Sequence, residues 1–202
     1  MTFAQNAYRI FEESVRNYHI DDDVDAPSRR PYADGTLEAV LYDKNHIDAV
    51  QWHLEDIIRD PNIDPVAALA LKRRIDRSNQ DRTDMVEELD THFRNKFASV
   101  VTEPDATINT ESPAWAFDRL SILALKIYHM EAEVAREDAT PEHRAKCAAK
   151  LAVLKEQQAD LTAAIDTLLD DMAAGRKFMK VYRQMKMYND VDTNPVLYAQ
   201  QK

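Results

Sequence analysis

The residues best suited to chemistry lie in one short segment, Trp52-His53-Leu54-Glu55-Asp56, which Arg59 follows. On a helix, His53 and Asp56 are three positions apart and share a face. A carboxylate beside a histidine holds the ring in one tautomer and makes it more basic, which suits a general base or a ligand. The same pairing also satisfies an ordinary buried histidine, so the segment predicts either a reactive group or a core residue.

A second segment places polar residues where an amphipathic helix would be apolar. Between Ile75 and Val86, the positions of the apolar stripe hold Asn79 and Arg82. Further polar residues surround them, namely Asp76, Gln80 and Asp84. This pattern predicts either a polar network that fixes the register of the helices or a polar pocket for a ligand.

Arg82 needs a partner, because burying an unpaired guanidinium costs several kcal/mol. Glu55 and Asp56, on the preceding helix, are the first candidates. However, the short connection between the two helices places them nearer Leu69 than Arg82. The pairing therefore depends on helix curvature, on side-chain reach or on an acid from another helix.

Spacing gives little support for metal, cofactor or nucleophile chemistry. No histidine has a glutamate three positions before it, as carboxylate-bridged bundles require, and His-Glu-x-x-His is absent. His129 and Glu133 share a helix face and supply two ligands but no complete site. The chain has 2 glycines, which excludes a Gly-rich phosphate loop and a dinucleotide fingerprint. We therefore expect no metal and no cofactor.

Charge and cysteine content indicate which partners the protein avoids and which compartment it occupies. The net charge of −10 repels nucleic-acid backbones and anionic membranes, so we expect no nucleic-acid partner. Cys147 is the single cysteine, lies in an Ala-rich run without an activating neighbour, and is expected to be at least partly buried. One thiol and no disulfide are typical of the cytoplasm. No apolar stretch is long enough to span a membrane.

One basic cluster departs from the acidic whole. Its members, within eleven residues that contain no acid, are Arg176, Lys177, Lys180, Arg183 and Lys186. They form either the solvated face of a terminal helix or a docking surface for a small anionic ligand or a partner.

The elements that position these residues are helices. A side-chain oxygen followed by proline marks a helix start at Asp64-Pro65, Ser112-Pro113 and Thr140-Pro141. Together with the apolar periodicity, these signals predict helices over 3–18, 36–60, 65–98, 113–138, 141–174 and 176–188. No segment alternates with a period of two, so we expect no sheet.

The expected fold is all-α: an elongated antiparallel bundle built from two similar long hairpins, in a single domain of residues 1–202. Its parts are an N-terminal helix with an acidic loop (1–35), a first hairpin (36–98), a second hairpin (113–174) and a basic C-terminal helix with a tail (175–202).

A weak internal repeat relates the two hairpins. Identical residues recur at an offset of 76 positions, including His53 with His129, Glu55 with Glu131, and Pro65 with Pro141. The offset predicts two copies of one hairpin about a pseudo-two-fold axis. The alternative is that amphipathic helices simply share composition. Because Ala132 stands where the first hairpin has Asp56, the first hairpin is the better candidate to hold a pocket.

Several strings carry a resemblance to a known family: 52–60 (WHLEDIIRD), 75–84 (IDRSNQDRTD), 108–133, 175–190 and 194–198 (NPVLY). The chain resembles a family of bacterial proteins classed as a domain of unknown function, whose genes are often found among those for surface-polysaccharide or lipopolysaccharide assembly. The resemblance implies a bacterial cytoplasmic protein with a helical fold. It supplies no activity and no catalytic residues.

Two functions remain open. The first is a cytoplasmic accessory protein of polysaccharide synthesis, with a protein partner or as a homo-oligomer. The second is an enzyme whose bundle pocket binds a phosphorylated or sugar substrate, with His53 as acid or base and Arg82 or Arg59 holding an anion. A closed network around Arg82 would favour the first, and an open cavity beside His53 would favour the second.

Overall fold

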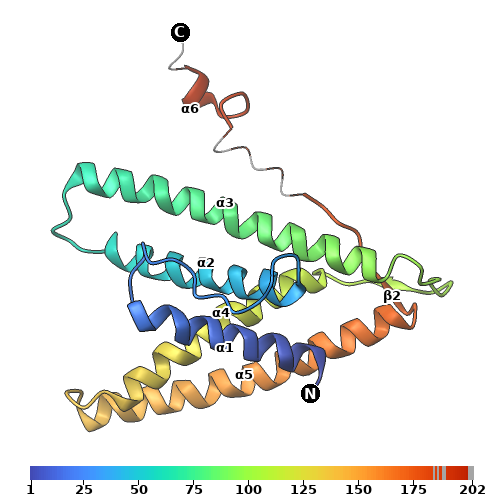
Figure 1. Cartoon of the computed structure of the whole chain (residues 1–202), viewed down its shortest axis with the longest axis horizontal. Coiled ribbons are helices and arrows are strands. Elements are labelled where there is room, and N and C mark those ends of the chain that lie inside the picture. Colours follow the sequence, from blue (N-terminus) through green and yellow to red (C-terminus); the bar gives the residue numbers. More distant parts are fainter. Residues whose placement is uncertain (184, 186, 188–189, 200–202) are drawn as a thin grey trace.

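Helices dominate the computed structural model, which describes residues 1–183, 185, 187 and 190–199. The helices are α1 (Phe3–Asp21), α2 (Leu37–Ile57), α3 (Pro65–Lys96), α4 (Pro113–Ala135), α5 (Pro141–Ala173) and the short α6 (Pro195–Tyr198). Helices α2 and α3 form one antiparallel hairpin, and α4 and α5 form another (Figure 1). The expected all-α class is confirmed.

The helix starts follow from their caps. Asp64 accepts hydrogen bonds from the backbone N–H groups of Val66 and Ala67, and Ser112 and Thr140 each cap the helix that a proline then begins. Proline lacks an N–H that the first helical position would leave unpaired, so it costs nothing there. The three predicted starts are confirmed.

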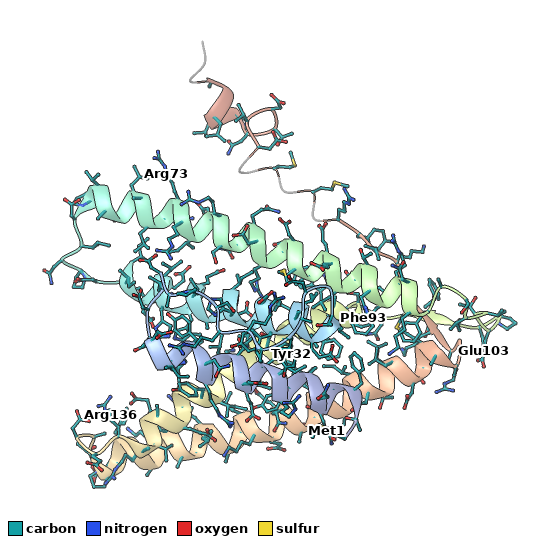
Figure 2. All side chains as sticks on the ribbon, viewed as in Figure 1. Met1, Tyr32, Arg73, Phe93, Glu103 and Arg136 are labelled. Carbon is teal, nitrogen blue, oxygen red and sulfur yellow. The ribbon has the colours of Figure 1, made fainter. Side chains whose placement is uncertain are left out.

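Helix α1 joins the two hairpins into one core, because it packs against α2, α4 and α5. Helices α1, α2 and α4 run in the same direction, while α3 and α5 return (Figure 1). Phe93 of α3 stacks on Phe117 of α4 with ring centroids 5.5 Å apart, and Phe3 meets both rings edge-on. Side chains from all five long helices fill the space between the ribbons (Figure 2).

The expected helix over 176–188 is wrong for the part of it that the structure describes. Gly175 has a φ of +78° and ends α5, with Arg176 N–H bonded to the carbonyl of Asp171 at 2.9 Å. This left-handed C-terminal motif turns the chain out of the helix. A Cβ at Gly175 would lie 2.4 Å from the carbonyl oxygen of Val101, so only glycine fits. Residues 184, 186, 188 and 189 lie outside the described residues.

The expectation of no sheet is also wrong. After Gly175 the chain forms β2 (Lys177–Phe178), which pairs in parallel with β1 (Thr107–Ile108). The pair ties the α3–α4 connection to the end of α5. Two residues are too few to give an alternating pattern, so periodicity could not reveal these strands.

Among the described residues, no helix combines the length and the apolar character that crossing a membrane requires.

Candidate functional site

Four charged residues meet in the middle of the bundle, and we call them the ion quartet: Lys44 and Asp48 of α2, Arg82 of α3 and Asp118 of α4. The ammonium of Lys44 lies 2.7 Å from Asp118 Oδ1 and also pairs with Asp48. Arg82 donates from Nε to Asp48 Oδ1 at 3.0 Å and from a terminal nitrogen to Asp118 Oδ2. Each carboxylate therefore faces both cations, and the charges of the quartet cancel.

The quartet is largely removed from water. The Lys44 side chain is 0% exposed, and both aspartates are buried. Ser121 of α4 extends the network by donating to Asp48 Oδ2 at 2.6 Å, and Asn45 donates to Ser121 Oγ at 2.9 Å. A buried charge is tolerated only when partners replace its water. These contacts therefore tie α2, α3 and α4 into one arrangement.

Arg82 does have carboxylate partners, but they are not the first candidates from the sequence. Glu55 and Asp56 instead pair with Arg59, just beyond the end of α2, at 3.2 and 3.6 Å. In an antiparallel hairpin, residues at similar distances from the connection lie opposite each other, so Arg82 meets an acid earlier in α2. The second carboxylate partner, Asp118, comes from α4. An acid from another helix was one of the alternatives that the sequence left open.

The other polar residues that the sequence singled out on α3 make contacts of their own. Asn79 accepts a hydrogen bond from Gln51 at 2.8 Å and so links α3 to α2. Asp76 pairs with Lys72 one turn away, and Asp84 accepts from Gln80 at 2.7 Å on the exposed side of the helix.

A pocket of about 540 Å³ opens beside the quartet, between α2, α3 and α4, and we call it the central pocket. Its lining residues are Asp48, Gln51, Trp52, Glu55, Asp56, Arg59, Arg82 and Ile122. Of the residues that the sequence proposed together, the structure brings Arg82, Glu55, Asp56 and Arg59 to this pocket. His53, Asn79, Asp76 and Asp84 are not on its lining.

His53 belongs instead to a group to which three helices each contribute one imidazole. We call His19 of α1, His53 of α2 and His129 of α4 the histidine cluster. Their ring centroids lie 5.1 to 5.5 Å apart. Tyr18 stacks on His53 at 5.0 Å, and Trp52 stacks on His129 at 4.8 Å. The aromatic neighbours hold the three rings together.

Burial controls the protonation of this cluster. It lowers the pKa of His129 to about 4 and also lowers the pKa of His53, and the neighbouring imidazoles add to both effects. The carboxylates of Asp22 and Asp56 act in the opposite direction but are outweighed. The expected gain in basicity of His53 is therefore wrong, because loss of water outweighs the nearby carboxylate.

A second cluster lies between the end of α4 and the start of α5. His143 Nε2 is 2.7 Å from Glu133 Oε2 and 3.4 Å from the thiol of Cys147. Cys147 is buried as expected, and His143, one turn before it, contacts its thiol. Both contacts use the same ring nitrogen, so the arrangement is not a proton relay from carboxylate through imidazole to thiol.

The basic residues after α5 do not share a helix face. Arg176 pairs with Asp171 at 2.7 Å, and Lys177 belongs to β2. Lys180 lines a pocket of about 330 Å³ at this end of the bundle, together with Trp115 and Tyr182. Arg183 is exposed, and Lys186 lies outside the described residues. In the second hairpin, Glu131 pairs with Lys155 at 2.8 Å.

The sequence reasoning missed Lys44, Asp48, Asp118 and His19. A signal existed for the first two, because they lie four positions apart on a helix face shared with Leu41. Arg82 was singled out because it is a charged residue on an apolar helix stripe, and Lys44 and Asp48 meet the same criterion. His19 lies in the last turn of α1, before an acidic loop, and no sequence pattern of this kind singles it out.

These features define an all-α bundle of two hairpins, with a buried ion network, an adjoining polar pocket and a histidine cluster. The chain belongs to the family described as "Protein of unknown function (DUF4254)", whose profile matches residues 38–181. No curated protein and no solved structure matches the chain. The matched segment contains the ion quartet, His53 and His129, while His19 precedes it.

Proposed function

We propose that the protein is a helical accessory protein that binds an uncharged, polyhydroxylated ligand, a sugar or glycan segment, in the central pocket. The observation that carries the proposal is the chemistry of the lining, which combines an indole with carboxylates, guanidiniums and an amide. A few placed polar groups beside apolar surface are typical of a small-molecule site.

The charges of the lining favour a sugar over a phosphorylated ligand. Arg82 is already paired with Asp48 and Asp118, and Arg59 with Glu55 and Asp56. Three carboxylates against two guanidiniums leave the lining with a net charge of −1. A phosphate would therefore meet more negative than positive charge, whereas sugar hydroxyls donate to carboxylates without a charge penalty.

Trp52 supplies the apolar surface that a sugar needs. Its indole is half-buried, lies against His129 on one side and lines the central pocket. The C–H face of a sugar ring packs on such a surface while its hydroxyls reach the surrounding polar groups. Glu55 and Asp56, one turn further along α2, are the acceptors nearest to solvent.

The cellular setting follows from the family resemblance. In this proposal the protein works in the bacterial cytoplasm and serves the synthesis of a surface polysaccharide. The sugar is then an intermediate or a segment of that polymer. A binding role of this kind requires no nucleophile and no proton relay.

Titration calorimetry on the full chain tests the proposal. We expect neutral oligosaccharides to bind, inorganic phosphate not to bind, and Glu55→Gln to weaken sugar binding about tenfold through the loss of a charged acceptor. Glu88→Gln is the matched control, because Glu88 is an exposed residue of α3 away from the central pocket. Binding of phosphate but of no neutral sugar, or equal effects of the two variants, would refute the proposal.

A second candidate role, docking to a protein partner or to a second copy, is favoured by the tip of the first hairpin. Val66 and Leu69 at the start of α3 are 77% and 53% exposed, and Ile57 at the end of α2 is also exposed. Exposed apolar side chains of this size are typical of contact surfaces when they occur together. Sedimentation of the wild type and of Val66→Asp/Leu69→Asp tests the self-association case. A wild-type monomer would exclude it.

A further inference from the structure

We infer that His19, His53 and His129 bind one divalent transition-metal ion, Zn²⁺ by its ligand preference, between α1, α2 and α4. One nitrogen from each of the three rings lies within 4.8 Å of the others. This inference is independent of the proposed sugar binding, because none of the three histidines lines the central pocket.

The spacing of the donor atoms matches a tetrahedral site. His53 Nε2 lies 3.3 Å from His19 Nε2. Zinc–nitrogen bonds of about 2.0–2.1 Å at tetrahedral angles place two ligand nitrogens about 3.3 Å apart. The two rings already stand at this separation, so a metal between them needs little rearrangement.

The hydrogen bond that His19 makes to the backbone selects the tautomer that a metal ligand needs. Its Nδ1 lies 2.7 Å from the carbonyl oxygen of Val15 one turn earlier. A carbonyl only accepts, so Nδ1 carries the proton and Nε2 presents its lone pair to the cluster. A backbone carbonyl that holds the outer nitrogen of a histidine is the usual support for a metal-bound imidazole.

His129 provides a second, independent sign. Its Nε2 is buried and has no hydrogen-bond partner in the described part of the chain. A buried polar atom without a partner is costly, and the cost disappears if a metal accepts the lone pair. Trp52, stacked on this ring, keeps it from turning toward water.

The surroundings also favour a cation over a packed core of neutral rings. Asp22 Oδ1 lies 3.9 Å from His53 Nε2, and Asp22 is exposed at the end of α1. Its backbone is held at a φ of +50°, with its N–H bonded to the carbonyl of Tyr18. Three imidazoles leave a fourth tetrahedral position, and Asp22 marks the side from which a carboxylate or water completes it.

The ligand set selects the kind of metal. Neutral imidazole nitrogens suit zinc, copper, nickel or cobalt, whereas calcium and magnesium require oxygen ligands. The nearest ligands along the chain are 34 residues apart, so no local motif announces the site.

The test is calorimetric titration of the chelator-treated full chain with ZnCl₂. A Cys147→Ser background removes the thiol of the second cluster, Glu133, His143 and Cys147, which could also take zinc. We expect one zinc ion per chain in this background. His53→Gln and His129→Gln should each weaken binding by about 100-fold or more, since even outer contacts of a metal site are worth 10–100-fold.

His92→Gln is the matched control, because His92 is an exposed histidine of α3 outside the cluster. It should leave the affinity unchanged. In the Cys147→Ser background, zinc should also raise the melting temperature of the parent chain and of His92→Gln but not of the two cluster variants, which keeps the test valid if those variants lose some stability. Cobalt should give the visible bands of a tetrahedral ion without a thiolate-to-cobalt band.

Three results would overturn the inference. The first is the absence of zinc binding in the Cys147→Ser background. The second is equal affinity in His53→Gln, His129→Gln and His92→Gln, which would mark adventitious binding. The third is binding that disappears with Cys147→Ser but persists when His53→Gln or His129→Gln is made in a chain that keeps Cys147, which would place the ion at the second cluster.

Discussion

Replacing Lys44 with methionine should be among the most damaging conservative changes in this chain. Methionine has a similar length and no charge, so the substitution removes one cation of the ion quartet and leaves two buried carboxylates facing only Arg82. Removing one partner of a buried ion pair costs about 3–5 kcal/mol, because the remaining charge cannot return to water. The Lys44 and Asp48 side chains are both 0% exposed, so water does not solvate the carboxylate charge that loses its partner.

Urea unfolding followed by circular dichroism measures this effect as a lower midpoint with an unchanged slope. Lys72→Met is the matched control. Lys72 pairs with Asp76 at the same i,i+4 spacing, but on the surface of α3. Exposed pairs contribute about 0–1 kcal/mol, so the control should unfold almost as the wild type does.

The double variant Lys44→Met/Asp118→Asn separates charge balance from packing. It leaves Asp48 and Arg82 as one neutral pair. The free-energy loss should therefore be at least about 1 kcal/mol smaller than the sum of the two single losses, within the range found for residues of one network. Equal losses for Lys44→Met and Lys72→Met, or strict additivity in the double variant, would refute the role assigned to the quartet.

Three further changes have definite expected outcomes. Thr140→Ala removes the cap of α5 and should cost about 1 kcal/mol in urea unfolding, and an unchanged midpoint would show that the cap contributes nothing. Gly175→Ala should lower the free energy of unfolding by more than about 1 kcal/mol, because φ is +78° and a Cβ would meet the Val101 carbonyl. An unchanged free energy of unfolding would contradict the turn described at that residue. Burial raises the pKa of Asp90, while a hydrogen bond from Ser112 opposes the rise. Charged Asp90 therefore destabilises the folded chain above its folded pKa, and this cost fades as pH falls toward the unfolded value of about 3.9. Asp90→Asn should be more stable than the wild type at pH 7, with an advantage that shrinks toward pH 4 in urea unfolding, and a pH-independent difference would refute this account.

The internal repeat stays a prediction. Residues related by the offset of 76 do meet across α2 and α4, since Asn45 donates to Ser121 and the ring of His53 lies 5.5 Å from that of His129. Equivalent residues of parallel helices meet in this way along a two-fold axis. Superposition of the two hairpins at this offset is the decisive measurement.

The sequence by itself determined where the long helices begin and which class of fold they form. Caps such as Asp64, Ser112 and Thr140 act within a few residues, so their effect can be read without knowing the rest of the chain. The same locality explains the failure after α5, where Gly175 ends the helix and the next residues pair with a segment some 70 positions earlier. Local residue preferences cannot predict a pairing between segments that lie so far apart in the sequence.

Only the tertiary structure decided which charged groups meet. The sequence required a carboxylate for Arg82 because an unpaired buried charge is too costly, but the identity of the partners depended on the register of α2 and on the approach of α4. The sequence alone predicts the histidine cluster even less, because its three rings come from three helices. Their proximity is produced by packing alone, because no spacing along a single helix can encode the distance between different helices.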